Sequence, residues 1–131
     1  MKKIIIEDTD LIQGRYHSLI HRYPDKIVIT VNNSTLTLPK QFCEFMKLKM
    51  SDEILFAKNT SGIYVCNATD KHKKEALLCH SLSSKDTKSG LQVSAKKLLI
   101  AGIQKGVYEL EQEEYFDNIS KISWYKLNFI E

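Results

Sequence analysis

The chain has 131 residues, 43% of them hydrophobic and 27% charged, a balance typical of one folded domain rather than of a disordered chain. None of its apolar runs approaches the roughly 18 to 20 residues that a membrane-spanning helix needs, so we expect a cytoplasmic protein without a membrane partner. The three cysteines show no paired spacing, which argues against a disulfide framework and for a reducing compartment.

The net charge of +3 is unevenly distributed along the chain. Residues 1–108 hold 17 basic against 10 acidic residues, a net of +7, whereas residues 109–131 hold 2 against 6, a net of −4. A basic surplus is typical of proteins with polyanionic partners, although a pI near 8.7 is lower than that of most dedicated nucleic-acid-binding proteins. The charge therefore permits a DNA partner without specifying one.

The first 38 residues predict a strand, a helix and a hairpin. Residues 2–6 form a short apolar run that predicts a strand, and the acidic residues after it offer N-caps for a helix that ends near residue 21. Residues 26–31 are rich in β-branched side chains and residues 35–38 alternate, with the turn sequence Asn32-Asn33-Ser34 between them. These two runs predict a β-hairpin.

A short helix and a second hairpin are expected next. Pro39 is suited to the start of a helix, and residues 41–46 continue it with Phe42, Phe45 and Met46 as its buried side chains. Residues 53–58 and 62–66 predict two strands joined by a turn.

The second half of the chain predicts elements of the same kinds. Thr69 is a cap for a helix over residues 70–80, and residues 81–90 lack large apolar side chains except Leu82, which predicts a flexible connector. A strand over 91–93, a helix over 95–101 that Gly102 ends, and closing strands over 107–110 and 122–129 follow.

Shifting the chain on itself by 55 positions superposes seven pairs of apolar residues, which indicates an internal repeat. The pairs are Leu36/Leu91, Leu38/Val93, Cys43/Leu98, Phe45/Ile100, Met46/Ala101, Leu48/Ile103 and Leu55/Leu110. The same shift places Pro39 on Ser94 and the turn residue Ser51 on Gly106. One such unit cannot bury its own apolar face, so we expect both to pack around a pseudo-two-fold axis, with Phe45 and Ile100 buried at equivalent places.

The repeat predicts a fold that is mainly β with short helices (α+β), a small barrel built from two β-α-β-β units. The single domain, residues 1–131, is expected to comprise an N-terminal strand and helix (1–25), a first unit (26–66), a helix and linker (67–90) and a second unit (91–131). A swapped-hairpin barrel and a double-psi-like barrel both satisfy this pattern.

Residues 26–66 carry a resemblance to a known family. Leu36-Thr37-Leu38-Pro39-Lys40 is an alternating strand that ends in an apolar-Pro-Lys step, and a short helix, Leu48-Lys49-Met50-Ser51-Asp52 and a hairpin follow it. This unit resembles the AbrB/MazE/SpoVT-like swapped-hairpin domains, and Ile103-Gln104-Lys105-Gly106-Val107 looks like a second, degraded copy, as in MraZ-like tandem proteins. Lys47 and Ser51 stand where the family usually has glycine.

The resemblance implies a DNA-binding transcriptional regulator or antitoxin whose basic face contacts duplex DNA. Carried onto this chain, the basic residues flank or follow the matched strands: Lys26, Lys40, Lys47, Lys49, Lys96 and Lys97. The alternative for each of them is an ordinary solvated lysine. Monomer and homodimer are both compatible with the resemblance.

Two other constellations contain metal-ligating residue types. Cys66, His72, Cys79 and His80 have zinc-type side chains but lack the closely spaced ligand pairs of structural zinc sites, so we expect no metal there. His17 and His21 share a helix face without the glutamate of metalloprotease motifs. No phosphate-binding glycine loop or nucleophile elbow is recognisable, so we expect neither an enzyme nor a cofactor.

The acidic end of the chain favours an alternative function, a protein-interaction module or inhibitor on the same barrel that binds no nucleic acid. Its acidic residues are Glu109, Glu111, Glu113, Glu114 and Asp117, and its candidate contact aromatics are Tyr115, Phe116 and Trp124. One contiguous positive face would favour DNA binding. Scattered lysines beside an exposed apolar or acidic patch would favour protein interaction.

Overall fold

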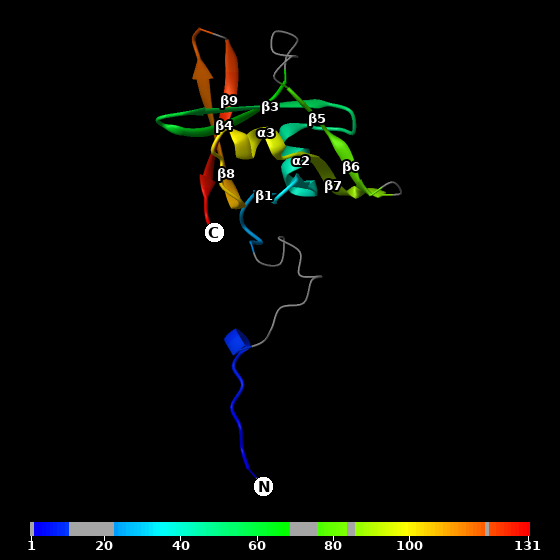
Figure 1. The fold of residues 1–131 in the computed structure, drawn as a ribbon, viewed down its shortest axis with the longest axis vertical. Helices are drawn as coiled ribbons and strands as arrows, with labels where there is room; N and C mark the ends of the chain where they lie inside the picture. Colours follow the sequence, from blue (N-terminus) through cyan, green and yellow to red (C-terminus); the bar gives the residue numbers. More distant parts are fainter. Residues whose placement is uncertain (1, 11–22, 69–75, 84–85, 120) are drawn as a thin grey trace.

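Two copies of one structural unit, each a β-hairpin, a short helix and a second β-hairpin, make up the fold (Figure 1). The computed structural model describes residues 2–10, 23–68, 76–83, 86–119 and 121–131. The first unit comprises β1 (Val28–Val31), β2 (Thr35–Pro39), α2 (Lys40–Met46), β3 (Glu53–Asn59) and β4 (Gly62–Asn67). The second comprises β6 (His80–Ser83), β7 (Asp86–Ser94), α3 (Lys96–Ile100), β8 (Gly106–Asp117) and β9 (Ile122–Phe129), and the two-residue strand β5 (Leu77–Leu78) precedes it.

The two units exchange their hairpins. The antiparallel sheet has the strand order β5-β3-β4-β9-β8-β1-β2-β7-β6, so the first hairpin of one unit pairs with the second hairpin of the other, as where Thr30 of β1 lies opposite Val107 of β8. Cys79 joins β5 to β6, and its backbone closes the ring with hydrogen bonds to Asp52 (2.8 Å) and Ser51 (2.9 Å). This arrangement confirms the expected small α+β barrel.

The 55-residue repeat is reproduced in individual hydrogen bonds. At the end of α2, the Lys47 N–H donates to Glu44 and the Leu48 N–H donates to Cys43 (3.3 and 2.9 Å). Two corresponding bonds of 3.0 Å end α3, from Gly102 to Leu99 and from Ile103 to Leu98. In both units this is the pattern that ends a helix with one left-handed residue. Thr37 also lies opposite its own counterpart Gln92, so the pseudo-two-fold axis passes between β2 and β7.

Two turn positions of the first unit are strained. Lys47 (φ 57°) and Ser51 (φ 74°) adopt positive φ, and glycines stand at the corresponding places of the second unit, Gly102 and Gly106. A side chain with a Cβ in the left-handed region costs about 1 kcal/mol relative to glycine. At these two positions the first unit therefore carries a conformational strain that the second avoids.

We expect Ser51→Gly to stabilise the protein by about 0.5–1 kcal/mol, because glycine relieves the positive φ of this turn. The melting temperature should rise by about 2–4 °C in a thermal scan. Ser51→Ala is the matched control, since it removes the hydroxyl and keeps the Cβ. An equal gain from alanine would mean that the strain is not in the backbone.

The main core draws on both units. Leu36 and Leu38 of β2, Phe42 of α2 and Val93 of β7 are almost completely buried against one another. A second, smaller cluster contains Leu55, Cys66 and Ile122, with Ala68 and Trp124 packed against it. Because successive strand residues point to opposite faces, this second cluster lies on the outer face of β3, β4 and β9.

The expected burial of Ile100 is wrong. Ile100 is 78% exposed, while Phe45 is partly buried and packs edge-on against Tyr125, with ring centroids 5.0 Å apart. The two helices differ in length, since α3 has five residues and α2 has seven. Leu98, two residues before Ile100, is the buried side chain of α3.

The expectations of an N-terminal strand and of a flexible connector are also wrong. Residues 2–7 have no regular secondary structure, η1 (Asp8–Asp10) is a 3-10 helix, and the rest of the expected first helix lies outside the described residues. A helix was expected over residues 70–80, but Leu77–Leu78 and His80–Ser83 form the strands β5 and β6. Residues 70–75 lie outside the described part of the chain. β7 occupies half of the expected connector, residues 86–90, where its backbone pairs with β6 at Asp86 and with β2 at Gly90.

Candidate functional site

Three of the six predicted lysines line one groove. The groove has a volume of about 840 Å³ and runs between α2, the turn that follows it and β7. Its lining residues are Lys40, Cys43, Glu44, Lys47, Leu48, Lys49, Met50, Gly90 and Leu91. We call this the basic groove. Glu44, Met50 and Gly90 were not expected to belong to a site from the sequence.

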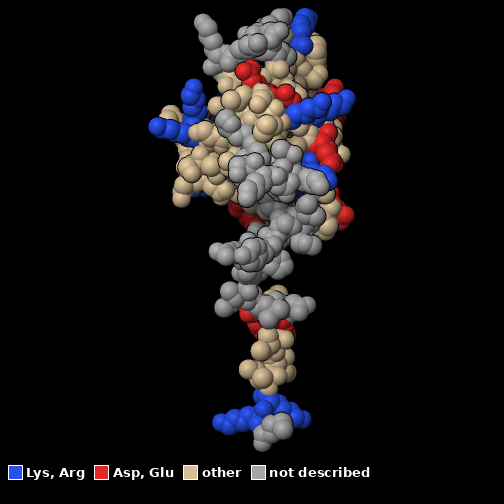
Figure 2. Space-filling view, turned by 90° about the vertical axis from the view of Figure 1, so that its right-hand side faces the viewer, with Lys and Arg blue, Asp and Glu red and all other residues tan. Residues whose placement is uncertain are grey.

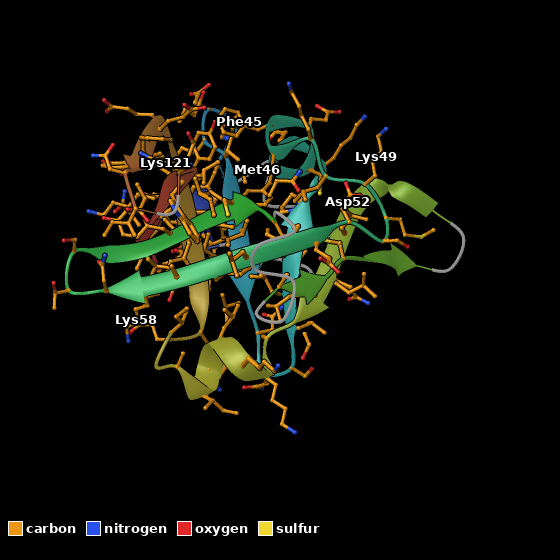
Figure 3. All side chains as sticks on the ribbon, turned by 90° about the horizontal axis from the view of Figure 1, so that it is seen from above. Phe45, Met46, Lys49, Asp52, Lys58 and Lys121 are labelled. Carbon is orange, nitrogen blue, oxygen red and sulfur yellow. The ribbon has the colours of Figure 1, made fainter. Side chains whose placement is uncertain are left out.

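Local structure explains how the three lysines converge. Lys40 is the first residue of α2, directly after Pro39, and Lys47 is the left-handed residue that ends the same helix. Lys49 begins a tight turn in which its backbone N–H donates to the Asp52 carboxylate at 2.8 Å. In Figure 3, Lys49 and Asp52 lie beside the start of β3, on the side of the barrel that carries α2. The groove is therefore assembled from residues within ten positions of one another, with β7 as its other wall.

The basic groove keeps a positive balance. Among the described residues that line it, the carboxylate is that of Glu44, which lies one turn along α2 from Lys40 and forms an ion pair with it at 3.8 Å. Both side chains are more than half exposed, so water and salt screen the pair and it holds Lys40 only weakly. Lys40 is therefore available to a stronger anionic partner.

The other three predicted lysines lie elsewhere. Lys26 forms an ion pair with Glu109 at 3.6 Å, and Lys96 and Lys97 belong to α3. Figure 3 shows α2 and α3 on opposite sides of the barrel. On the face shown in Figure 2, basic side chains stand in separate groups with acidic side chains between them. The structure thus brings Lys40, Lys47 and Lys49 together and separates them from the α3 pair.

A second groove lies on the outer face of the β8–β9 hairpin. It has a volume of about 340 Å³ and is lined by Ala57, Asn59, Tyr64, Tyr115, Phe116, Asp117 and Trp124. We call it the aromatic groove. All three aromatic residues expected at an interaction surface are in it, and Tyr64 of β4 adds a fourth. Tyr64 was not expected here from the sequence, because it is brought next to the other aromatic residues by the pairing of β4 with β9.

The aromatic side chains of this groove are ordered but accessible. The rings of Tyr64 and Tyr115 pack edge-to-face with centroids 5.7 Å apart, and Tyr115 lies opposite Trp124 in the β8–β9 pair. Tyr115 is 39% exposed and Phe116 is 56% exposed. The groove borders the outer cluster against which Trp124 packs, so an apolar surface continues from that cluster to solvent.

One acidic residue of β8 lines the aromatic groove, and another accepts a hydrogen bond from a tyrosine of its lining. The β8–β9 register shifts by two residues between Leu110 and Glu114, a bulge that takes Glu111 and Glu113 out of regular pairing. The Tyr115 hydroxyl donates to Glu111 at 3.0 Å, and this bond raises the pKa of Tyr115. Asp117 lies within the groove lining. The surface therefore combines aromatic faces with carboxylates.

The cysteines are buried and protonated at neutral pH. Burial raises the pKa of Cys43 and of Cys66 to about 11 and that of Cys79 to about 12. Cys66 and Cys79 belong to different apolar clusters, so the structure does not bring these two zinc-type side chains into one site. His72 and the side chain of His80, the other two members of that constellation, lie outside the description, as do His17 and His21.

Within the described ranges, no cluster of three or more histidine, cysteine or acidic side chains is arranged to hold a metal ion. No described helix is long and apolar enough to cross a membrane. Comparison of the chain with protein-family models, with curated proteins and with solved structures finds no match.

Proposed function

We propose that this protein is a DNA-binding regulator or antitoxin that contacts the phosphate backbone of duplex DNA through Lys40, Lys47 and Lys49. The observation that carries the proposal is the convergence of these three lysines on one groove with a single carboxylate. The barrel with exchanged hairpins is also the fold that the resemblance to AbrB/MazE/SpoVT-like domains implies. A fold alone does not establish a function, so the test concerns the groove.

Lysine chemistry suits contact with the DNA backbone. A lysine ammonium is a compact point charge on a flexible stem, which binds phosphate without reading the base sequence. Each phosphate that is neutralised releases counterions, so the affinity falls steeply as salt is added. The basic groove therefore supplies affinity and orientation on the duplex.

The aromatic groove favours a second function, the docking of a protein segment on the same barrel. Exposed aromatic side chains beside carboxylates form the surface that the sequence analysis associated with protein interaction. The lysine groups separated by acidic side chains in Figure 2 also agree with that alternative better than one continuous positive face would. The two functions use different residues, and each has its own test.

The DNA proposal predicts a large and salt-dependent loss of affinity when the three lysines are replaced together by glutamine. The log–log slope of affinity against salt should become shallower by about 2.7, because each lost phosphate contact removes about 0.9. At about 100 mM salt the affinity should fall roughly 10²- to 10³-fold. Fluorescence anisotropy with a labelled duplex of mixed sequence, between about 50 and 200 mM salt, measures both quantities.

The matched control replaces Lys96, Lys97 and Lys121 by glutamine, which removes the same charge outside the basic groove. It should leave most of the salt slope intact. Failure of the unmodified protein to bind DNA at about 50 mM salt would overturn the proposal. Equal losses in the two triple variants would show that net charge, and not the groove, is responsible.

A further inference from the structure

The aromatic groove gathers rings from three neighbouring strands on one face of the sheet. Tyr115 of β8 lies opposite Trp124 of β9, and directly paired residues point to the same face. Tyr64 of β4 packs against Tyr115 with an angle of 73° between the ring planes, so the two rings form a corner. The cross-strand neighbour of Tyr64 on β3 is Ala57, whose single methyl group fills little of the space beside it.

Carboxylates accompany these rings. Residues 111–117 contain four acidic residues and no basic one, and no described lysine forms an ion pair with Glu111, Glu113 or Glu114. The hydrogen bond to Glu111 is the main cause of the raised pKa of Tyr115, and the charges of Glu111 and Glu113 add to it. The edge of the groove therefore has a negative potential, which favours a cation.

The lysines of the neighbouring strands are directed elsewhere. Lys58 of β3 donates to the backbone oxygens of Ala101 and Gly102 at the end of α3, both at 3.3 Å. The end of the Lys126 side chain on β9 lies beside Gly62, at the turn between β3 and β4. None of the described residues that line the groove is basic, so we expect its cation to come from another molecule.

Of the cationic side chains, arginine suits a groove of rings and carboxylates best. Its guanidinium is planar and weakly hydrated, so it stacks on aromatic faces, and its N–H donors form a fork that matches a carboxylate. A lysine ammonium is compact and strongly hydrated, which makes its transfer from water to an aromatic groove more costly. The combination of the two kinds of side chain therefore favours arginine over lysine.

The carboxylates extend further than a single side chain can reach. At about 3.4 Å per residue, β8 is about 20 Å long between Glu111 and Asp117. Alternate residues of an extended chain point to the same side. An extended segment with basic residues at alternate positions can therefore place one of them in the groove and the others beside the carboxylates of β8.

We propose that the aromatic groove binds an arginine side chain on an extended basic segment of a partner protein. The guanidinium lies against the rings of Tyr64, Tyr115 and Trp124, and it donates to the carboxylate of Glu111 at their edge. This inference rests on the protein-docking function and names the chemistry of the partner. It does not depend on DNA binding, since the basic groove repels the same segment.

Trp124 makes the binding directly observable. It is the only tryptophan of the chain and it lines the aromatic groove, so the tryptophan fluorescence of the full-length protein reports on that groove. The probe is the peptide acetyl-Ala-Arg-Ala-Arg-Ala-Arg-Ala-amide, which should change the emission in a saturable way. The same peptide with lysine in place of arginine should bind about tenfold more weakly. A peptide with citrulline, which has the shape of arginine without its charge, should show no binding.

Two substitutions of Tyr115 separate the ring from the hydroxyl. Tyr115→Leu removes a ring from a side chain that is 39% exposed, and it should weaken binding of the arginine peptide about tenfold. Tyr115→Phe keeps the ring and leaves the Glu111 carboxylate to the guanidinium, so this variant should bind the peptide at least as tightly as the unmodified protein. Equal losses in the two variants would show that the ring is not the contact, and they would overturn the proposal.

The carboxylates have a charge-matched control. Glu111→Gln with Asp117→Asn should weaken binding of the arginine peptide about tenfold, and the loss should diminish at high salt, because exposed charges are screened. Asp25→Asn with Glu44→Gln removes the same charge at exposed positions outside the groove and should leave the affinity nearly unchanged. Equal losses in the two double variants would mean that net charge alone attracts the peptide, against the proposal.

The three peptides distinguish failure of this inference from failure of the docking function. Equal binding of the arginine, lysine and citrulline peptides would overturn the preference for arginine and leave segment docking in place. Binding of none of them would remove both. Equal affinities for the arginine and lysine peptides, with none for the citrulline peptide, would reduce the interaction to charge and would also overturn the proposal.

Discussion

Truncation of Phe42 to alanine should lower the free energy of unfolding by about 3–5 kcal/mol, the usual loss for a fully buried phenylalanine. Phe42 is 0% exposed and is the largest of the fully buried side chains. It fixes α2 on the core shared by the two units, so its loss leaves a cavity where both units meet. Urea denaturation followed by circular dichroism measures the change.

Phe45→Ala is the matched control for this experiment. It removes the same side chain from the same helix, but Phe45 is only partly buried and packs mainly on Tyr125. Its loss should be about half that of Phe42, because less apolar area returns to water. Equal losses at the two positions would contradict the described orientation of α2.

Gly90→Ala should destabilise the barrel by about 3 kcal/mol or more. Gly90 has φ +119°, and an added Cβ would lie 2.2 Å from the backbone oxygen of Leu38, on the neighbouring strand. A positive φ for alanine already costs about 1–3 kcal/mol, and the contact can be relieved only by moving β2 away from β7. The unfolding midpoint in urea should fall accordingly.

Gly62→Ala separates the two contributions. Gly62 also has positive φ, +148°, but its added Cβ would meet the flexible end of the Lys126 side chain, which can move aside. The loss of stability from Gly62→Ala should therefore be smaller than that from Gly90→Ala, by the free energy needed to displace the β2 backbone. If Gly62→Ala were as harmful as Gly90→Ala, conformational strain alone would explain both.

The architecture could be predicted from the sequence wherever the signal was local or repeated. The alternation of residues 35–38, the helix after Pro39 and the apolar match at a distance of 55 residues were enough for the barrel and its pseudo-symmetry. The 55-residue offset of the repeat was also predictable. Leu48 and Ile103, which this offset superposes, make equivalent backbone hydrogen bonds after their helices. These features depend on neighbours along the chain, which a sequence displays directly.

The missed features depend on neighbours in space. β6 and β7 contain few large apolar residues and are held by backbone pairing with each other and, through β7, with β2, so composition predicted a flexible connector instead. Ile100 matched Phe45 in the repeat, but the shorter α3 leaves it in solvent. Matching the two repeats residue by residue does not reveal that their helices differ in length.

The candidate sites show the same difference between neighbours along the chain, which could be predicted, and neighbours in space, which could not. Six lysines were expected on one basic face, and only Lys40, Lys47 and Lys49, which are close in sequence, line one groove. Tyr64 was not recognised as a neighbour of Tyr115, because their edge-to-face contact requires β4, β9 and β8 to lie side by side. The wall that β7 provides to the basic groove was missed for the same reason.

The exchange of hairpins also sets the order of events during synthesis. Thr30 pairs with Val107, 77 residues later. The edge of β1 that does not pair with β2 therefore has no partner until β8 has left the ribosome. At about 5–20 residues per second, the first unit waits roughly 4–15 seconds with that edge unpaired. During this interval the nascent chain exposes the apolar residues of a half-built barrel. Binding of a holdase chaperone to ribosome-bound chains should therefore be strongest before residue 106 emerges and should decline once β8 can pair.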